Sequence, residues 1–205
     1  FRVGLVFQYP EYQLFAETVR ADIAFGPKNM NLSAEECDAR VARAAAFCGI
    51  DETVLSRSPF ELSGGQKRRA AIAGVLAMDP EVLVLDEPAA GLDPRGREEI
   101  LGGLMEYQKQ RQSTMLIISH SMEDIAKYAD SILVLKNGKI FLFGTVGEVF
   151  ADAQKLFDSS LDLPQITKLF VELQKRGLAD RTDVYTVGYA VKTAAKLAEN
   201  AAKEL

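Results

Sequence analysis

Two short groups of residues in this chain have the types and the spacing needed for chemistry on a phosphate group. The first is Ser63, Gly64 and Gly65, which stand directly before a helix-forming stretch. Glycines free the backbone, and the first amides of a helix, at its positive dipole end, can bind an anion such as a terminal phosphate. The second group is Asp86 and Glu87, which follow an apolar run. One carboxylate at such a place can serve a magnesium ion while the other polarises a water molecule.

A sheet of buried strands is needed to hold these groups. The run 82–85 is apolar at every position, which is typical of a parallel strand buried on both faces. Strands are also predicted at 2–7 and 115–119, and helices at 97–112 and 122–128. This alternation predicts an α/β fold with a doubly wound, mostly parallel sheet. The carboxyl ends of the strands are where such sheets bind their ligands.

Helices fill the region between the first strand and the glycine pair. A short helix is predicted at 18–25, ended by the Gly-Pro pair at 26–27. Ser33 and Glu36 have the spacing of a capping box, which begins a second helix. Gly49 is expected to end that helix, because glycine adopts the left-handed conformation of a helix C-terminus.

Two cysteines lie on this second helix. Cys37 and Cys48 are eleven positions apart, so a helix would separate them by roughly 16 Å, too far for a disulfide. They share a face with Val41 and Ala44, which predicts buried thiols and not metal ligands. Free buried thiols fit cytoplasmic surroundings.

The last third of the chain reads as a hairpin followed by two helices. Strands at 131–136 and 139–143 flank Asn137 and Gly138, a pair typical of a tight hairpin turn. After Pro164, a helix ended by Gly177 carries apolar residues at helical spacing. They are Ile166, Leu169, Phe170 and Leu173.

A final helix is predicted at about 187–205, with its apolar and small residues on one side. They are Val187, Ala190, Val191, Ala194 and Ala198. An amphipathic pair outside the main sheet must bury that side against something, either its own domain or a second subunit. The sequence leaves both alternatives open.

Composition excludes some classes of function. The formal net charge of −5 argues against a general nucleic-acid-binding surface, which normally shows a basic patch. The densest basic cluster, Lys67, Arg68 and Arg69, is more typical of a solvated helix face than of a binding site. The longest nearly apolar stretch, 70–78, is far shorter than the roughly 20 residues of a membrane-spanning helix.

Taken together and in order, five motifs resemble those of ATP-binding-cassette (ABC) nucleotide-binding domains. Each is weak alone, but their joint order and spacing leave very little room for chance. The chain is therefore identified as a member of that family. The motifs are the Q-loop at Gln8, the signature Leu62–Gln66, the Walker B strand at 82–87, the D-loop at 90–93 and the switch histidine His120.

The resemblance implies a P-loop NTPase-type α/β fold. Its mostly parallel sheet core would carry a helical subdomain, inserted at about 9–75, and a C-terminal helical appendage. The nucleotide-binding domain would occupy 1–155, and 156–205 would form a possible dimerisation segment.

The resemblance also implies roles in ATP hydrolysis. Glu87 would act as general base or orient the attacking water, and Asp86 would hold Mg²⁺ through water. Gln8 would bind the magnesium shell or the attacking water, and His120 would touch the terminal phosphate. Asp93 would communicate across a dimer.

In this family the signature closes over the nucleotide of the opposite subunit. The functional unit would therefore be a dimer that ATP binding closes and hydrolysis opens. The chain departs from the family at Ala89, where threonine is usual, without affecting the carboxylates. The residues implied to contact the partner's ATP are Ser63, Gly64, Gly65 and Gln66.

One motif of the family does not occur in these residues. ABC proteins hold ATP phosphates with a loop of the form G-x-x-x-x-G-K-[ST], and the 205 residues contain no such segment. The loop would lie upstream of Gln8, yet the chain opens at Phe1 without methionine. We expect that the chain is truncated or that its N-terminal part is not represented. The chain as given is then expected to bind ATP poorly and to be inactive alone.

Within the family, three stretches are most similar to the ATPases of energy-coupling-factor transporters, at 7–15, 22–29 and 58–73. This implies a subunit peripheral to the cell membrane on its cytoplasmic face, powering uptake of a vitamin or transition-metal ion. The implied partners are a second ABC ATPase, identical or different, a transmembrane coupling protein and a substrate-binding membrane subunit, with no nucleic acid.

Two alternatives remain on sequence alone. The first is a DNA-repair or chromosome-maintenance ATPase with the same cassette, although no heptad array of a long coiled coil appears. The second is a non-catalytic fragment or regulatory protein. The missing phosphate loop favours that alternative, whereas the presence of Gln8, Glu87 and His120 disfavours it.

Overall fold

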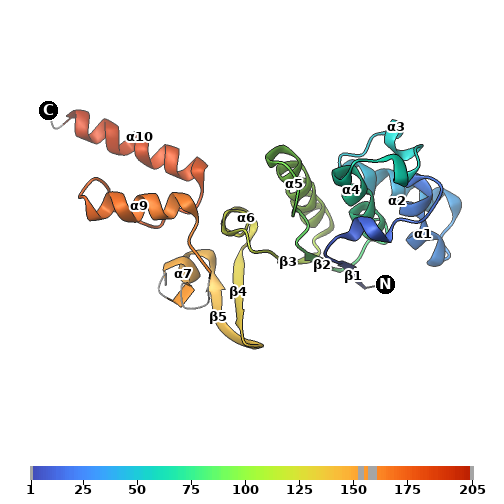
Figure 1. Ribbon diagram of the computed structural model, residues 1–205, viewed down its shortest axis with the longest axis horizontal. Coiled ribbons are helices and arrows are strands. Elements are labelled where there is room, and N and C mark those ends of the chain that lie inside the picture. Colours follow the sequence, from blue (N-terminus) through green and yellow to red (C-terminus); the bar gives the residue numbers. More distant parts are fainter. Residues whose placement is uncertain (1, 152–154, 157–160, 204–205) are drawn as a thin grey trace. The chain divides into compact units, whose positions relative to one another are not determined.

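The structure is a computed structural model that describes residues 2–151, 155–156 and 161–203, with side chains described as far as 196. The chain divides into two compact units, Phe1–Ile118 and Ser119–Leu205. Figure 1 shows the elements of each unit. No described helix is long and apolar enough to cross a membrane.

The first unit is built on a three-stranded parallel sheet. Strands β1 (Val3–Val6), β2 (Val82–Asp86) and β3 (Thr114–Ile118) lie in that order, so β2 is the central strand. Val6 pairs with Leu85, and Asp86 pairs with Ile118. The mostly parallel α/β core expected from the sequence is confirmed.

Burial of the central strand is one-sided within this unit. Leu83 and Leu85 are fully buried, whereas Val82 and Val84 are only partly buried. Helix α4 (Gly64–Leu76) packs against β1 on the buried side. The sequence predicted that this strand is buried on both faces. In the described part of this unit, only one face is fully buried.

Helix α1 (Val19–Asn29) continues through the Gly-Pro pair, so the prediction that it stops before residue 26 was wrong. Pro27 lies in the last turn, where it removes only one ladder bond. Gly26 permits a close approach, since a Cβ there would lie 2.5 Å from Cγ of Met78. Packing against the end of α4 thus outweighs the helix-breaking tendency of the pair.

Helix α2 (Ala34–Phe47) begins at Ser33, whose Oγ accepts a hydrogen bond from the Glu36 amide at 3.2 Å. The Glu36 carboxylate instead accepts from Nε of Arg40 at 2.8 Å, so only the serine half of the predicted capping box forms. Cys37 and Cys48 are buried free thiols, as predicted.

Shorter elements and one long helix complete the first unit. Helix α5 begins directly after Asp93 and packs against α2. The elements are η1 (Pro10–Gln13), α3 (Glu52–Leu55), η2 (Pro59–Glu61) and α5 (Pro94–Arg111).

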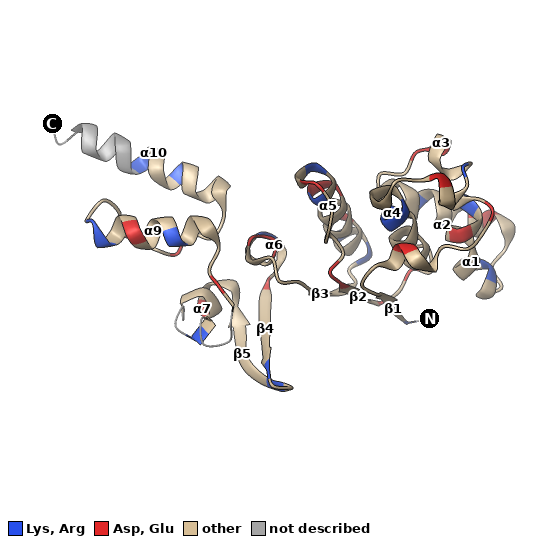
Figure 2. Ribbon diagram, viewed as in Figure 1, with Lys and Arg blue, Asp and Glu red and all other residues tan. Residues whose placement is uncertain are grey.

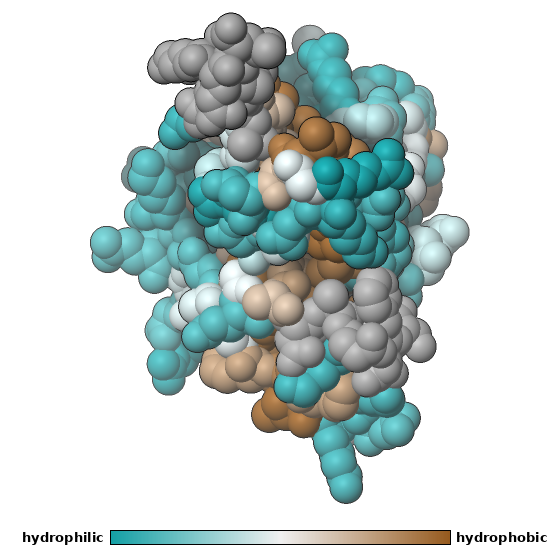
Figure 3. All heavy atoms as spheres, turned by 90° about the vertical axis from the view of Figure 1, so that its left-hand side faces the viewer, coloured by the Kyte–Doolittle hydropathy of each residue, from teal (hydrophilic) through white to brown (hydrophobic). Residues whose placement is uncertain are grey.

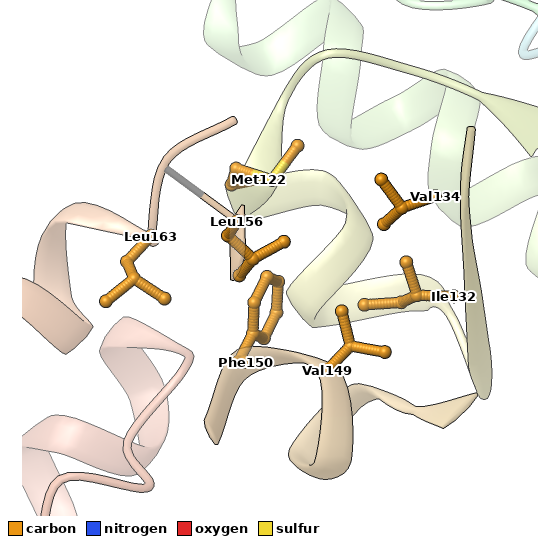
Figure 4. Packing of buried hydrophobic residues seen from close by; sticks show 7 residues of the cluster. All are labelled: Met122, Ile132, Val134, Val149, Phe150, Leu156 and Leu163. Carbon is orange, nitrogen blue, oxygen red and sulfur yellow. The ribbon is translucent and has the colours of Figure 1, made fainter. Parts of the chain in front are cut away.

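The second unit begins with α6 (Met122–Tyr128) and an antiparallel hairpin of β4 (Ser131–Lys136) and β5 (Lys139–Thr145), followed by α7 (Val146–Ala151). Asn137 and Gly138 both have positive φ angles, 51° and 71°, which confirms the predicted hairpin turn. An apolar core joins these elements (Figure 4). It consists of Met122, Ile132, Val134, Val149, Phe150, Leu156 and Leu163.

Helices α9 (Gln165–Lys175) and α10 (Val187–Lys203) form a pair with a small core of its own. Phe170 is its largest buried side chain, and the buried Thr167 hydroxyl donates a hydrogen bond to the Val184 carbonyl at 2.7 Å. The core residues are Phe170, Ala179, Val184 and Ala190, with Ile166 and Leu173 partly buried beside them.

The predicted one-sided stripe of α10 is only partly buried in its own unit. Ala190 is buried, but Val187 and Val191 are 66% and 64% exposed and Ala194 is also exposed. Thr193, which the prediction omitted, is buried and bonds within the helix to the Tyr189 carbonyl. The last predicted member of the stripe, Ala198, lies outside the described side chains. Figure 3 views the molecule from the side of α9 and α10 and shows apolar surface bordered by hydrophilic surface.

Candidate functional site

The signature turn is the N-terminus of α4, and Ser63 is its cap. The Ser63 hydroxyl accepts from the Gln66 amide at 3.3 Å, and the Gln66 side-chain oxygen accepts from the Ser63 amide at 3.1 Å. This reciprocal capping box fixes the start of the helix. The ladder of an α-helix provides no partner for its first amides. Those of Gly64 and Gly65 are therefore the groups of this turn suited to bind an anion.

A cleft of about 450 Å³ opens beside the signature turn. It brings Ser63, Gly65 and Gln66 together with Asp93, four of the residues singled out in the sequence. A Cβ on Gly65 would lie 3.2 Å from Cδ2 of Leu92, so the signature and the turn at 91–93 are packed closely. Gly64 is exposed next to the cleft.

Asp93 caps α5, with its Oδ1 accepting from the Gly96 amide at 2.6 Å. A Cβ on Gly96 would stand 2.9 Å from the same oxygen, so a residue without a side chain is needed for this short contact. The cap keeps the Asp93 carboxylate at the wall of the cleft.

Arg69 also lines the cleft and was missed by sequence reasoning. Its guanidinium binds the Glu99 carboxylate at 2.5 Å and is only 17% exposed. The pKa of Glu99 lies below its usual range because Arg69 and then Arg95 donate hydrogen bonds to the carboxylate. The left-handed Gly49, with φ of 62°, makes room for Arg69, since a Cβ there would lie 2.9 Å from Nη1.

The prediction that the basic cluster is a solvated helix face was wrong for two of its three residues. Arg68 is 4% exposed, and Arg69 faces the cleft. Charges that follow one another along a helix point in different directions, so neighbours in sequence can have different surroundings. The available signal was their place in the second turn of the helix that the signature begins.

Asp86 and Glu87 lie at the carboxyl end of the central strand. Asp86 is the last residue of β2, and the Glu87 amide donates to the Ile118 carbonyl at 2.9 Å. Glu87 has a left-handed backbone, with φ of 49°, and its carbonyl accepts from the Ala90 amide at 3.1 Å. The chain therefore turns sharply immediately after the strand.

Gln8 lies at the same sheet edge. It stands two residues beyond Val6, just as Glu87 stands two residues beyond Leu85, the partner of Val6 in the parallel register. The carboxylate of Asp86 and the amide oxygen of Gln8 are oxygen donors of the kind that Mg²⁺ prefers. Among the described residues, no three His, Cys, Asp or Glu side chains are placed to hold a metal. Asp86 and Gln8 are the residues at this edge that could hold a magnesium ion.

His120 belongs to the second unit, where it is exposed and stands next to Ser121, the cap of α6. The structure thus groups the predicted residues of the first unit into two places. Ser63, Gly65, Gln66 and Asp93 line the cleft, and Gly64 is exposed beside it. Gln8, Asp86 and Glu87 lie at the sheet edge and are not part of the cleft wall.

Comparison with known proteins decides the family. A family model described as ABC transporter matches residues 2–90. The energy-coupling factor transporter ATP-binding protein EcfA2 of Clostridium tetani is 52% identical over 202 residues, which are 98% of this chain and 70% of that protein. The chain belongs to the ATP-binding subunits of energy-coupling factor transporters.

Other members of the family agree with this assignment. EcfA2 of Caldanaerobacter subterraneus is 55% identical over 186 residues, which are 91% of this chain and 65% of that protein. The solved structure of cbiO1 from Clostridium perfringens, described as part of the ABC transporter complex cbiONQ, has a TM-score of 0.69 and 41% identity. That alignment covers 86% of this chain and 66% of that structure. The chain thus spans about two thirds of the length of these relatives.

A solved dimer of an ATP-binding cassette, in a post-hydrolysis state with ADP and Pi, is 25% identical with a TM-score of 0.62. It covers 71% of this chain and 63% of that one. These neighbours confirm the P-loop NTPase-type fold, and the family implies ATP binding and association with a membrane transporter. The relatives are transporter subunits, which disfavours the alternative of DNA repair or chromosome maintenance.

Proposed function

We propose that this chain is the ATP-hydrolysing subunit of an energy-coupling-factor importer that powers uptake of a vitamin or a transition-metal ion. It would act at the cytoplasmic face of the membrane. Its partners would be a second ABC ATPase, a transmembrane coupling protein and a substrate-binding membrane subunit. Support comes from the family, from a relative described as part of a transporter complex and from a relative solved as a dimer.

The observation that carries the proposal is the separation of the two groups of site residues. The signature and Asp93 share one cleft, while Gln8, Asp86 and Glu87 occupy the sheet edge outside its wall. A nucleotide that needs both groups can reach both when two subunits face each other. Each ATP would then lie between the sheet edge of one subunit and the signature of the other.

At the sheet edge, Glu87 would accept a proton from the attacking water as that water bonds to the terminal phosphorus and ADP leaves. Asp86 and Gln8 would hold Mg²⁺, Asp86 through water, and Gln8 would also orient the attacking water. When bound, Mg²⁺ offsets the negative charge that develops on the phosphates. His120 would donate a hydrogen bond to the terminal phosphate.

At the cleft, the amides of Gly64 and Gly65 would bind the partner's terminal phosphate. The Ser63 hydroxyl and the Gln66 side chain already bond to each other's backbone, so they would act chiefly by holding this turn open toward the ligand. Asp93, fixed as the cap of α5, would carry the signal from one site to the other.

We also propose that residues 1–155 form the nucleotide-binding domain and that 156–205 help to join two subunits. The exposed apolar positions of α9 and α10 support this role, because an amphipathic helix gains stability when that face is covered. The weak ATP binding expected of the 205 residues alone stays a prediction, which calorimetry on the isolated chain tests.

The decisive experiment is Glu87→Gln in the full-length protein assembled with its partner ATPase. Phosphate release should fall at least about 100-fold, since a positioned general base contributes on the order of 10² or more. ATP-driven association of the subunits should persist, because the amide keeps the size of the carboxylate. Unchanged phosphate release would contradict the assignment of the base.

Glu81→Gln provides a matched control. Glu81 stands directly before β2, at the opposite end of the same strand, and its carboxylate is exposed and paired with Arg2 at 2.8 Å. The same chemical change there should leave phosphate release within about 2-fold of the parent protein, as for surface substitutions away from special features.

A further inference from the structure

A single guanidinium joins three motif-bearing segments of the first unit. Arg68 lies in the second turn of α4, and its side chain is 5% exposed. Its Nε and Nη2 donate to the two carboxylate oxygens of Glu11 at 3.2 and 3.1 Å, and its Nη1 donates to the Ala90 carbonyl. The guanidinium carbon also lies 5.9 Å from the ring centre of Tyr9.

Both partners of Arg68 lie next to residues assigned to the chemistry. Glu11 is part of η1, which begins two residues after Gln8. Ala90 is in the turn that follows Glu87, and its amide donates to the Glu87 carbonyl at 3.1 Å. Arg68 itself is carried by the helix that the signature begins (Figure 2 shows the basic positions on α4).

The segment around η1 is also held at its far end. The buried carboxylate of Asp22, on α1, accepts from the amides of Phe15 at 3.2 Å and Ala16 at 3.0 Å. The segment that starts at Gln8 is thus fixed to α1 at its end and to Arg68 in its middle. The Glu11 carboxylate that Arg68 holds therefore lies between Gln8 and the attachment to α1.

The geometry requires an arginine. Two parallel bonds to one carboxylate and a third to a carbonyl match the planar fork of a guanidinium, whereas an ammonium group offers a single point of charge. A pair used only for stability is commonly replaceable by apolar side chains of similar volume. The contact to a backbone carbonyl in a functional turn adds a positional role.

We propose that Arg68 is a positioning residue that couples the turn at 8–13 to the turn at 87–93. Movement of Gln8 would reach Glu87 through Glu11, the Arg68 guanidinium and the Ala90 carbonyl, so the water-activating carboxylate is in place only when the Gln8 segment is. This inference rests on the proposed function of Gln8 and Glu87.

The test is Arg68→Lys in the full-length protein assembled with its partner ATPase, beside Arg40→Lys as a matched control. Arg40 also bonds one carboxylate, that of Glu36, and one backbone carbonyl, that of Met78, but lies on α2 away from both turns. Arg68→Lys should lower kcat for ATP about 10-fold with KM changed less than about 2-fold, since small misplacement slows chemistry more than binding. Arg40→Lys should change both constants less than about 2-fold.

Hydrogen exchange supplies a readout that does not require hydrolysis. Arg68→Lys should speed exchange at both turns, including the amides of Tyr12 and Ala90, which bond to Tyr9 and Glu87. Glu11→Gln should do the same more weakly, and the effects of the two substitutions on kcat should not add in the double variant. If Arg68→Lys prevents folding, Glu11→Gln alone provides the same test.

Three results would overturn the inference: equal effects of the two lysine variants on kcat, additive effects of Arg68→Lys and Glu11→Gln, or faster exchange at only one turn. Failure of the proposed function is a separate result. If the parent protein hydrolyses no ATP, that function is wrong, and hydrogen exchange still decides whether Arg68 links the two turns.

Discussion

The cleft of the first unit and the helix pair α9–α10 of the second are held together by different kinds of contact. Around the cleft, polar side chains make directional bonds: Arg69 of α4 binds Glu99 of α5, and Asp93 caps the start of α5. The helix pair is held by a core of four buried residues and one buried hydrogen bond from Thr167. Directional bonds fix positions, whereas a small apolar core mainly holds surfaces together.

The two regions also differ in what they leave exposed. The cleft presents glycine amides and helix-capping side chains to a polar ligand. The helix pair presents large apolar side chains such as Leu169, Leu178 and Val187. The first region is therefore organised for precise contacts to a small ligand, and the second for contact with another apolar surface.

The largest effect is expected in the helix pair, from Phe170→Ala. Removing this buried ring leaves a cavity in a core of four residues, which should lower the free energy of unfolding of α9 and α10 by about 3–5 kcal/mol. Hydrogen exchange in the full-length protein would show faster exchange in these helices with no change in α4. Leu169→Ala, at a neighbouring position that is 50% exposed, should cost less than about 0.5 kcal/mol. Equal loss of protection in α4 would show that the helix pair does not depend on a core of its own.

In the first unit, two adjacent glycines of α5 should respond in opposite directions to substitution by alanine. A Cβ on Gly103 would lie 1.8 Å from the backbone carbonyl oxygen of Phe47, so Gly103→Ala forces α5 away from α2. We expect it to lower the free energy of unfolding by about 1–3 kcal/mol. Gly102→Ala meets no atom within 4 Å and should instead stabilise the helix by about 0.5–1 kcal/mol. Urea unfolding measures both values, and the same sign for both would show that the α2–α5 contact is not tight.

The smallest effect on stability at neutral pH is expected for Cys48, which lies next to the cleft wall. Burial raises the pKa of its thiol to about 12, although the positive charge of Arg69 opposes this rise. Native protein at pH 8 should therefore react with a thiol reagent only as fast as it unfolds, while urea-unfolded protein should react at once at Cys37 and Cys48.

The raised pKa of Cys48 also predicts how the stability of the protein depends on pH. The neutral thiol of Cys48 is favoured in the folded state, so its contribution to stability is complete below its ordinary pKa of 9.0 and is lost as pH rises toward about 12. Unfolding measured at pH 8 and at pH 11 in the protein and in Cys48→Ala tests this. A pH dependence that is the same in both would contradict the assignment to Cys48.

Much of the sheet and of the site was accessible from sequence, because the signals are local. The apolar run before Asp86 predicted the central strand, and the Asn137–Gly138 pair predicted the hairpin turn. Ser63 and the glycines predicted the helix start that borders the cleft. In each case the residues that give the sequence signal also form the strand, turn or helix start that was predicted.

The errors concern partners that are distant in sequence. Helix α1 continues past Pro27 because Met78 packs on Gly26, and nothing near Pro27 indicates that contact. Arg68 is buried because Glu11, 57 positions away, provides the opposite charge. The buried side of α10 is set by where α9 lies, which the helical repeat of the sequence alone does not specify.

The backbone of Glu87 carries a further consequence. A left-handed conformation is unfavourable for any residue with a side chain, and glycine would adopt the same φ of 49° with less strain. A selection for thermal resistance alone would thus favour Glu87→Gly and would discard the carboxylate. At this one position, greater stability of the fold and retention of the acidic group are opposing demands.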